Sequence, residues 1–245
     1  MVELAHKDPV PETPMATKTV PWAYSGPQGP EHWGDLSRDF ISCKIGQKQS
    51  PINIEHVKLT QSFPKLVFHY TSSPLQLQHD GRLLLAKTAP QNSMLVGKKR
   101  FELKTLIFHS PSEHTVEEAP YTFEVQLIHQ NEFKEFAVVS IFLQESKKSH
   151  AAISTLWKAL PSLKGELGPQ ISFQLSSLLP RNRDYYTYSG SLTTPPCTEG
   201  FTWYILKSPS ELSTKQVDAY HALFKKNARP AQRAFGRVVY LQSQS

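Results

Sequence analysis

The sequence lacks any apolar run approaching the roughly 18 residues of a membrane-spanning helix, so we expect that the chain does not span a bilayer. It also lacks an internal repeat, a collagen-like glycine period and sustained heptads, which excludes helical-repeat, collagen and coiled-coil architectures. Only 2 of the 245 residues are cysteine, and no C-x-x-C pair occurs. A cysteine-based zinc or thioredoxin-like site is therefore not expected.

What the sequence does contain is typical of a globular protein. Hydrophobic residues make up 39% and charged residues 20%, which argues against a disordered chain. The 19 prolines outnumber the 11 glycines, and this balance favours a rigid, turn-rich and strand-dominated fold. Length alone allows one large domain or two small ones.

The charge balance is modestly basic, with 27 Lys and Arg against 21 Asp and Glu and a net charge of +6. Such a balance is compatible with an acidic partner or a polyanion. The densest basic runs are Lys98–Arg100, Lys147–Lys148 and Lys225–Lys226, and none is interleaved with aromatic residues. We therefore expect no nucleic-acid partner.

The pattern along the chain predicts one β-rich domain of the α+β class. Residues 1–19 are polar and aperiodic and are predicted to form an extended N-terminal arm, followed by a domain over 20–241 and a C-terminal tail over 242–245. Strands are predicted at 65–70, 75–78, 82–87, 101–109, 122–129, 135–143 and 201–206. Helices are predicted at 151–160 and 214–226, the second capped by Ser213.

The two cysteines, Cys43 and Cys197, lie far apart in the sequence. They are either buried small hydrophobes or the two halves of one long-range disulfide, which would require an oxidising compartment. The first 25 residues carry charges and prolines and no apolar signal-peptide core. If the protein is exported, we expect the targeting segment to be absent from this chain.

The histidines alone do not predict a metal site. His109 would need a partner two positions away to share its strand face, and that residue is Ile107. His129 on the next strand faces away from Glu124 and Gln126, so it could join His109 only through a register slip or a bulge. Structural histidines, hydrogen-bonded to carboxylates or to the backbone, are the simpler interpretation.

Several longer motifs resemble the α-class carbonic anhydrases, in order over residues 20–241. These motifs are Trp22–Tyr24, Gly29–Trp33, Gln49–Ile54, Phe108–His114 and Ser189–Gly200. The resemblance implies a single domain around a large, twisted, mostly antiparallel sheet with short peripheral helices. In disulfide-bearing members the bridge joins the positions that match Cys43 and Cys197, so the resemblance supports the oxidised state.

The resemblance also implies where a zinc ion would be held. The family's three histidine ligands fall at Ile107, His109 and Gln126 in this sequence, so two of the three are missing. We therefore expect that zinc is lost, and with it the hydroxide nucleophile. Thr193 and Glu113 match the pair that orients this hydroxide in the family.

The positions around the expected metal site also differ from the family. The proton-shuttle position is Arg82, which cannot relay protons at neutral pH. The carbon dioxide pocket maps to five residues, of which Phe201 replaces a usual valine: Ile128, Val138, Leu192, Phe201 and Trp203. We expect these side chains and Ile107 to fill the site as apolar core.

The sequence therefore predicts a catalytically silent carbonic-anhydrase-like protein with a structural or binding role, rather than an enzyme. A protein partner or a larger assembly is expected, of unknown identity, in the periplasm, outside the cell or in an organelle lumen such as the thylakoid. One alternative is an active zinc carbonic anhydrase that uses His79 or His129 beside His109. Another is a small anion-binding module with Thr193, Thr194, His109 and Gln126 as polar contacts.

Overall fold

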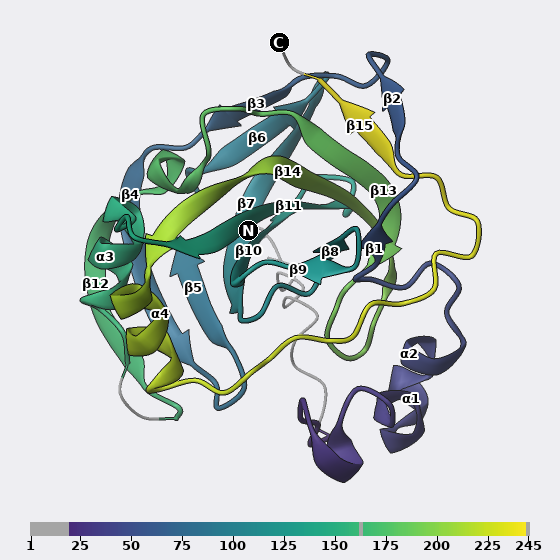
Figure 1. Cartoon of the computed structure of the whole chain (residues 1–245), viewed down its shortest axis with the longest axis horizontal. Helices are drawn as coiled ribbons and strands as arrows, with labels where there is room; N and C mark the ends of the chain where they lie inside the picture. The colour runs from purple at the N-terminus through teal and green to yellow at the C-terminus, as the bar shows by residue number, and fades with distance from the viewer. Residues whose placement is uncertain (1–19, 162–163, 244–245) are drawn as a thin grey trace, which may run out of the picture.

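Twelve strands form one large sheet in the computed structural model, which describes residues 20–161 and 164–243 (Figure 1). They are β2 (Lys58–Thr60), β3 (Leu66–His69), β4 (Ser72–His79), β5 (Leu84–Thr88), β6 (Ser93–Val96), β7 (Lys99–His109), β10 (Phe123–Gln130), β11 (Phe136–Ser146), β12 (Leu167–Gln174), β13 (Tyr185–Ser191), β14 (Glu199–Ser213) and β15 (Tyr240–Gln242). The order across the sheet is β12-β4-β5-β7-β10-β11-β14-β13-β15-β2, and β3 pairs with β6 beside β7.

Most neighbouring strands in this sheet run antiparallel. The exceptions are β11 with β14 and β15 with β2, which are parallel. A small second sheet is made by β1 (Asn53–Ile54), β8 (Thr115–Val116) and β9 (Ala119–Pro120). The predicted β-rich fold with one large, mostly antiparallel sheet is confirmed.

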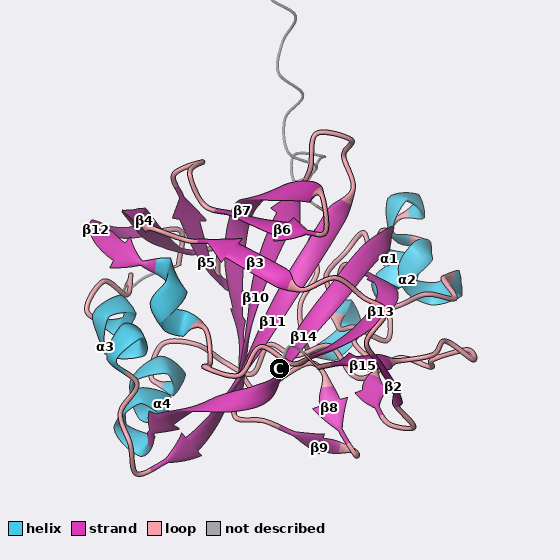
Figure 2. Cartoon of the chain, turned by 90° about the horizontal axis from the view of Figure 1, so that it is seen from above, coloured by secondary structure: helices cyan, strands magenta, loops and turns pink. Residues whose placement is uncertain are grey.

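The helices are short and lie at the margins of the sheet. They are α1 (Trp33–Leu36), α2 (Ser42–Ile45), α3 (Ala151–Trp157) and α4 (Thr214–His221), with 3-10 turns at Gly26–Gln28, Arg38–Phe40 and Leu175–Leu178. In both views α3 and α4 lie together at one side, and α1 and α2 lie at the other (Figures 1 and 2). None of the helices in the described ranges is long and apolar enough to cross a membrane.

The start of α4 was predicted correctly, but its end was not. Ser213 caps the helix in a capping box with Gln216, whose side chain accepts a hydrogen bond from the Ser213 backbone N–H at 3.0 Å. The helix ends at His221 instead of Lys226. Beyond it Phe224 is buried in the core, and Asn227 is hydrogen-bonded to the backbone of β7.

The sheet separates two apolar cores because side chains alternate along its strands. On β10, Val125 and Leu127 belong to the larger core, which also receives α3 and α4. The residues between them, Glu124 and Gln126, face the other side, where Ile107 and Phe201 belong to a smaller core. The whole of β10 from Phe123 to His129 is buried, so both of its faces are covered.

Several strands were not predicted, for reasons that their residues explain. β12 contains Gly168 and Pro169, which disfavour strands, and β13 is buried on both faces and so lacks alternation. At the C-terminus β15 extends through Gln242, which pairs with Tyr185, so the predicted tail begins one residue too early. The predicted arm, 1–19, lies outside the described residues.

The disulfide predicted by the resemblance joins Cys43 of α2 to Cys197, with an S–S distance of 2.02 Å. The bridge belongs to a third, small cluster with Trp33 and Phe40. It therefore ties the loop that precedes β14 to the helical N-terminal segment. A disulfide is the state expected in an oxidising compartment.

We predict that the double substitution Cys43→Ser, Cys197→Ser lowers the free energy of unfolding by about 2–5 kcal/mol, because the bridge closes a very long loop in the unfolded chain. Urea unfolding followed by tryptophan fluorescence measures the difference. The wild-type protein unfolded with and without reductant is the control. Equal midpoints for the bridged and unbridged proteins would contradict the prediction.

Candidate functional site

The register between β7 and β10 gathers the three predicted ligand positions on one face of the sheet. Gln126 lies directly opposite Ile107, and Glu124 lies directly opposite His109. Because residues two apart on a strand share a face, all four side chains point to the same side. All are buried, with His109 at 0% and Gln126 at 2% exposure.

His129 does not join this group, although a register shift follows Ile128 in the β7–β10 pairing. It faces the larger core, where its Nε2 lies 2.6 Å from the hydroxyl of Tyr70. Burial lowers the pKa of His129 to about 4, so the ring is neutral at pH 7. The prediction that His129 faces away from His109 is therefore confirmed.

His79 has its own partners on β4. Its Nδ1 accepts a hydrogen bond from the backbone N–H of Gly81 at 2.7 Å, and its ring stacks on Phe224. Across residues 20–161 and 164–243, no group of three or more His, Cys, Asp or Glu side chains is arranged to hold a metal ion.

The ring of His109 is fixed by the segment after α4. Its Nδ1 donates a hydrogen bond to the backbone carbonyl of Asn227 at 2.8 Å, because a carbonyl can only accept. The amide of Asn227 accepts from the Ser110 N–H and donates to the Phe108 carbonyl, which anchors it to the end of β7. The Nε2 of His109 makes no hydrogen bond and lies 3.5 Å from Glu113 Oε2.

Glu113 is a buried carboxylate that accepts hydrogen bonds at both oxygens. Its Oε1 accepts from the backbone N–H of Arg229 at 2.9 Å, and its Oε2 accepts from Gln126 Nε2 at 2.8 Å. The side chain of Thr193 also lowers the pKa of this carboxylate. Burial raises the pKa of Glu113 above its usual value, and His109 and these hydrogen bonds oppose that rise.

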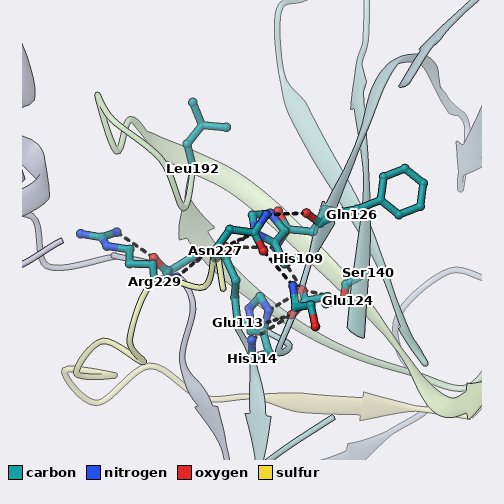
Figure 3. A network of polar contacts seen from close by, with 12 residues as sticks. His109, Glu113, His114, Glu124, Gln126, Ser140, Leu192, Asn227 and Arg229 are labelled. Atoms are coloured by element: carbon teal, nitrogen blue, oxygen red, sulfur yellow. Dashed lines mark hydrogen bonds and ion pairs between the residues drawn. The ribbon is translucent and has the colours of Figure 1, made fainter. Parts of the chain in front are cut away.

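Glu124 is the most heavily hydrogen-bonded carboxylate of the network (Figure 3). Its Oε2 accepts from the backbone N–H groups of Glu113 and His114, both at 2.9 Å. Its Oε1 accepts from His114 Nδ1 and Ser140 Oγ at 2.8 Å and from Gln126 Nε2 at 3.2 Å. Burial alone would raise its pKa, but His114 and these hydrogen bonds lower it to about 2.

Gln126 connects the two carboxylates. Its amide nitrogen donates to Glu113 Oε2 and to Glu124 Oε1, and so both of its N–H bonds are directed at buried acceptors. The side chain at this ligand position therefore presents hydrogen-bond donors, not a lone pair, to the two carboxylates.

His114 is a buried structural histidine, as the sequence suggested. Its Nδ1 lies 2.8 Å from Glu124, and its Nε2 lies 2.6 Å from the hydroxyl of Tyr188. The ring also packs at 4.6 Å from Trp203. Both ring nitrogens are occupied, so His114 has no free atom for a ligand.

Arg229 links the site to the disulfide segment. It is 2% exposed, and its guanidinium donates to the side chain of Gln49 and to the carbonyls of Ser50 and Cys43. Its backbone N–H reaches Glu113 at the same time. The position of the buried carboxylate therefore depends on the packing around Cys43.

The sequence analysis assigned no role to Ser140, Asn227 or Arg229. Ser140 interrupts the apolar run of β11, and such a lone polar residue was the pattern that could have indicated a buried hydrogen bond. Asn227 and Arg229 lie in a loop, and nothing in their own pattern indicates which strand they contact.

The five pocket residues named from the sequence lie together on the same side of the sheet as Ile107. Ile128, Val138, Phe201 and Trp203 belong to one buried cluster with it, and Leu192 packs against that cluster. Phe201 is 3% exposed and stacks on Phe136 at 4.6 Å. All of them except Leu192 are buried, and the ring of His109 has no exposed surface.

Arg82 lies on the β4–β5 turn and does not contact His109 or Glu113 through any of its hydrogen bonds in the described chain. Its guanidinium stacks over Trp22 at 4.1 Å and pairs with Asp80 at 3.3 Å. Arg82 is therefore engaged at the edge of the domain.

The family model of eukaryotic-type carbonic anhydrases matches residues 28–243 of this chain. A carbonic anhydrase of Nostoc sp. is 36% identical over 93% of this chain and 88% of its own length. An α-carbonic anhydrase of Thermovibrio ammonificans, solved with the inhibitor sulfanilamide, is 36% identical over 91% of this chain and all of that one, with a TM-score of 0.87. Dioscorin complexed with ascorbate is 30% identical over 92% of this chain and 99% of its own, with a TM-score of 0.83.

We predict that Glu124 makes the fold acid-sensitive. Its folded pKa of about 2 lies below its usual value of 4.5, so the stability it contributes is present above pH 4.5 and is lost as the pH falls toward 2. This contribution is on the order of 3 kcal/mol. Urea unfolding is measured at intervals from pH 7 to pH 2. The free energy of unfolding should fall less steeply with decreasing pH in Glu124→Gln than in the wild type.

The exposed residue Glu132 provides the matched control, because Glu132→Gln removes the same charge at the surface. Glu113 works in the opposite direction, since a raised pKa costs stability above pH 4.5. The test therefore uses the difference between each variant and the wild type. If Glu124→Gln and Glu132→Gln change the decrease in the free energy of unfolding between pH 7 and pH 2 equally, the role given to Glu124 is wrong.

Proposed function

Because the chain belongs to the eukaryotic-type carbonic anhydrase family, we propose that it is a non-catalytic member whose scaffold has a binding or structural role. The proposal rests on one observation above the others. At the position of a ligand, the amide of Gln126 donates hydrogen bonds to Glu113 and Glu124. These two carboxylates are thereby bridged by a neutral side chain of the protein itself.

The side chains at the three ligand positions do not fit a zinc ion. A catalytic zinc site needs three protein ligands and an open fourth position. Ile107 has no donor atom, and an amide is a poor zinc ligand beside imidazole. His109 alone offers a free nitrogen, and the other nearby imidazole, His114, uses both of its nitrogens in hydrogen bonds. We therefore derive no reaction step through zinc.

The remaining polar groups orient but do not activate a nucleophile. The side chain of Thr193 lowers the pKa of Glu113, so the two groups interact and could together position a hydroxyl group. Water that is not bound to a metal keeps a pKa far above neutrality, so no hydroxide forms there at neutral pH. The volume beside His109 is also filled by Phe201 and Ile107, which leaves little room for a substrate.

A small-molecule receptor is the second candidate. Two observations favour it: His109 Nε2 is buried without a hydrogen-bond partner, and the similar protein dioscorin was solved in complex with ascorbate. The filled volume around His109 argues against it, since a ligand would have to displace Phe201 or Leu192. Thr193, Thr194 and Gln126 would be its other polar contacts.

The role of the scaffold would then involve a protein partner or a larger assembly in an oxidising compartment, such as the periplasm, the extracellular space or an organelle lumen. The disulfide between Cys43 and Cys197 supports the oxidising compartment. The net charge of +6 supports an acidic partner surface.

We predict that purified protein dialysed against zinc carries far less than one equivalent of the metal and hydrates carbon dioxide at the uncatalysed rate. Elemental analysis and a stopped-flow hydration assay measure the two quantities. A thermal shift with bicarbonate, ascorbate and sulfanilamide tests the second candidate in parallel. Stoichiometric zinc together with turnover well above background would overturn the proposal in favour of an active enzyme.

We further predict that Ile107→His combined with Gln126→His creates zinc binding, because the two new rings would face His109 across β7 and β10. Glu124 already accepts hydrogen bonds beside position 126 and could orient the new ring. Competition with a chromogenic chelator measures the affinity. Adding Phe201→Val should then allow activity to rise.

Two matched variants make this result specific. Ile107→His alone should bind zinc much more weakly than the double variant, because a third imidazole is still missing. Adding His109→Ala to the double variant should abolish the gain. A folded double variant with no measurable zinc affinity would show that the ligand positions have been assigned to the wrong residues.

A further inference from the structure

A pocket of about 190 Å³ lies at the end of the sheet where β6, β7 and β14 come together. It is lined by Val96, Lys99, Phe101, Glu135, Phe136, Gly200, Thr202 and Tyr204. Phe101 and Tyr204 belong to the larger core, whereas Ile107 belongs to the smaller one. Phe136, which also lines the pocket, packs against the smaller core, so the pocket lies at the end of the sheet beside both cores.

The pocket has a mixed lining, with an ion pair at its lip and the largely buried rings of Phe101 and Tyr204, 6% and 8% exposed, among its other residues. At the lip, Lys99 Nζ lies 2.9 and 2.8 Å from the two carboxylate oxygens of Glu135. This ion pair joins the turn between β6 and β7 to the turn between β10 and β11.

The turn between β10 and β11 holds an exposed aromatic ring in a fixed place. The side chain of Asn131, itself buried, accepts from the Glu135 N–H at 2.9 Å and donates to the Glu135 carboxylate at 2.6 Å. The Lys134 N–H donates back to the Asn131 carbonyl. Between them Phe133 is 71% exposed, although an aromatic ring normally gains most by burial.

The surroundings of Phe133 and the pocket are predominantly basic. Lys98, Arg100 and Lys134 are exposed, and none of them forms a salt bridge with any residue that the structure describes. The acidic residues close by are fewer, and two of them, Glu102 and Glu135, are already paired with lysines. The two turns therefore present two free cations, Lys98 and Lys134, beside the pocket and an exposed ring, whereas Arg100 lies on the strand face opposite to the pocket-lining Phe101.

We propose that the two turns form a docking surface for an acidic segment of a partner protein, with an apolar side chain of that segment seated in the pocket beside Phe133. Carboxylates on either side of the seated residue would pair with Lys98 and Lys134. Buried aromatic anchors surrounded by complementary charge are the usual source of binding energy and specificity in protein interfaces. The proposal identifies the partner surface of the binding role proposed above, and so rests on it.

The test uses the intact protein and two synthetic peptides. One peptide has a central phenylalanine flanked on each side by two acidic residues, and the other replaces the acidic residues by lysines. We expect the acidic peptide alone to shift the backbone NMR resonances of Gly200, Thr202 and Tyr204 in a saturable manner. Absence of these shifts at millimolar peptide, or equal shifts with the basic peptide, would overturn the proposal.

Substitutions then measure the contributions of the basic residues and of the Phe133 ring to peptide binding separately. Lys98→Glu combined with Lys134→Glu should weaken binding about tenfold or more, whereas the exposed pair Lys225→Glu, Lys226→Glu should not. Phe133→Ser should weaken binding, and Phe235→Ser, at another exposed ring, is its control. Equal effects of a variant and its control would contradict the surface as defined.

A lipid surface is the competing partner, and a sedimentation assay with phosphatidylglycerol vesicles tests it. Binding to vesicles that depends on Phe133, without any response to the acidic peptide, would replace the proposal by a membrane contact. The hydration assay is independent of these measurements. An active enzyme that also binds the acidic peptide would refute the non-catalytic role and leave the docking surface in place.

Discussion

The hydrogen bonds from Gln126 to Glu113 and Glu124 are the constraint on which the interior of this protein depends. Two carboxylates buried close together destabilise a fold unless donors or cations compensate them. In this chain the compensation comes from a side-chain amide, from backbone N–H groups and from His114. A buried polar network is stable only when its members are satisfied, and among the residues of this one the atoms left without a partner are His109 Nε2 and Arg229 Nε.

Apolar side chains and one buried arginine enclose this hydrogen-bond network. Ile107 and Phe201 fill the side of the sheet toward which His109 points, so the network is enclosed on that side. Arg229 encloses it from the other end and connects it to the disulfide segment. The network is thus flanked by apolar side chains on one side and by a buried guanidinium group on the other.

The sequence allowed the fold to be predicted, together with the shared sheet face of Ile107, His109 and Gln126, because both depend on long motifs and on strand alternation. The facing of His129 away from His109 followed from counting residues along one strand. The hydrogen bonds from Gln126 to the two carboxylates could not be predicted in this way. Strand alternation indicates which face of the sheet a side chain lies on, but not which acceptors lie there. Asn227 and Arg229 were missed for a related reason, since a loop residue reaches a strand through the tertiary fold alone.

The position of β14 in the sheet has a consequence for the order in which the protein can fold. This strand lies in the middle of the sheet, between β11 and β13, yet it comes from the last fifth of the chain. During synthesis on the ribosome, the edge of β11 stays unpaired until β14, which ends at residue 213, has emerged. Such non-local pairing slows folding and leaves an open edge, so the newly made chain is aggregation-prone until β14 has paired with β11.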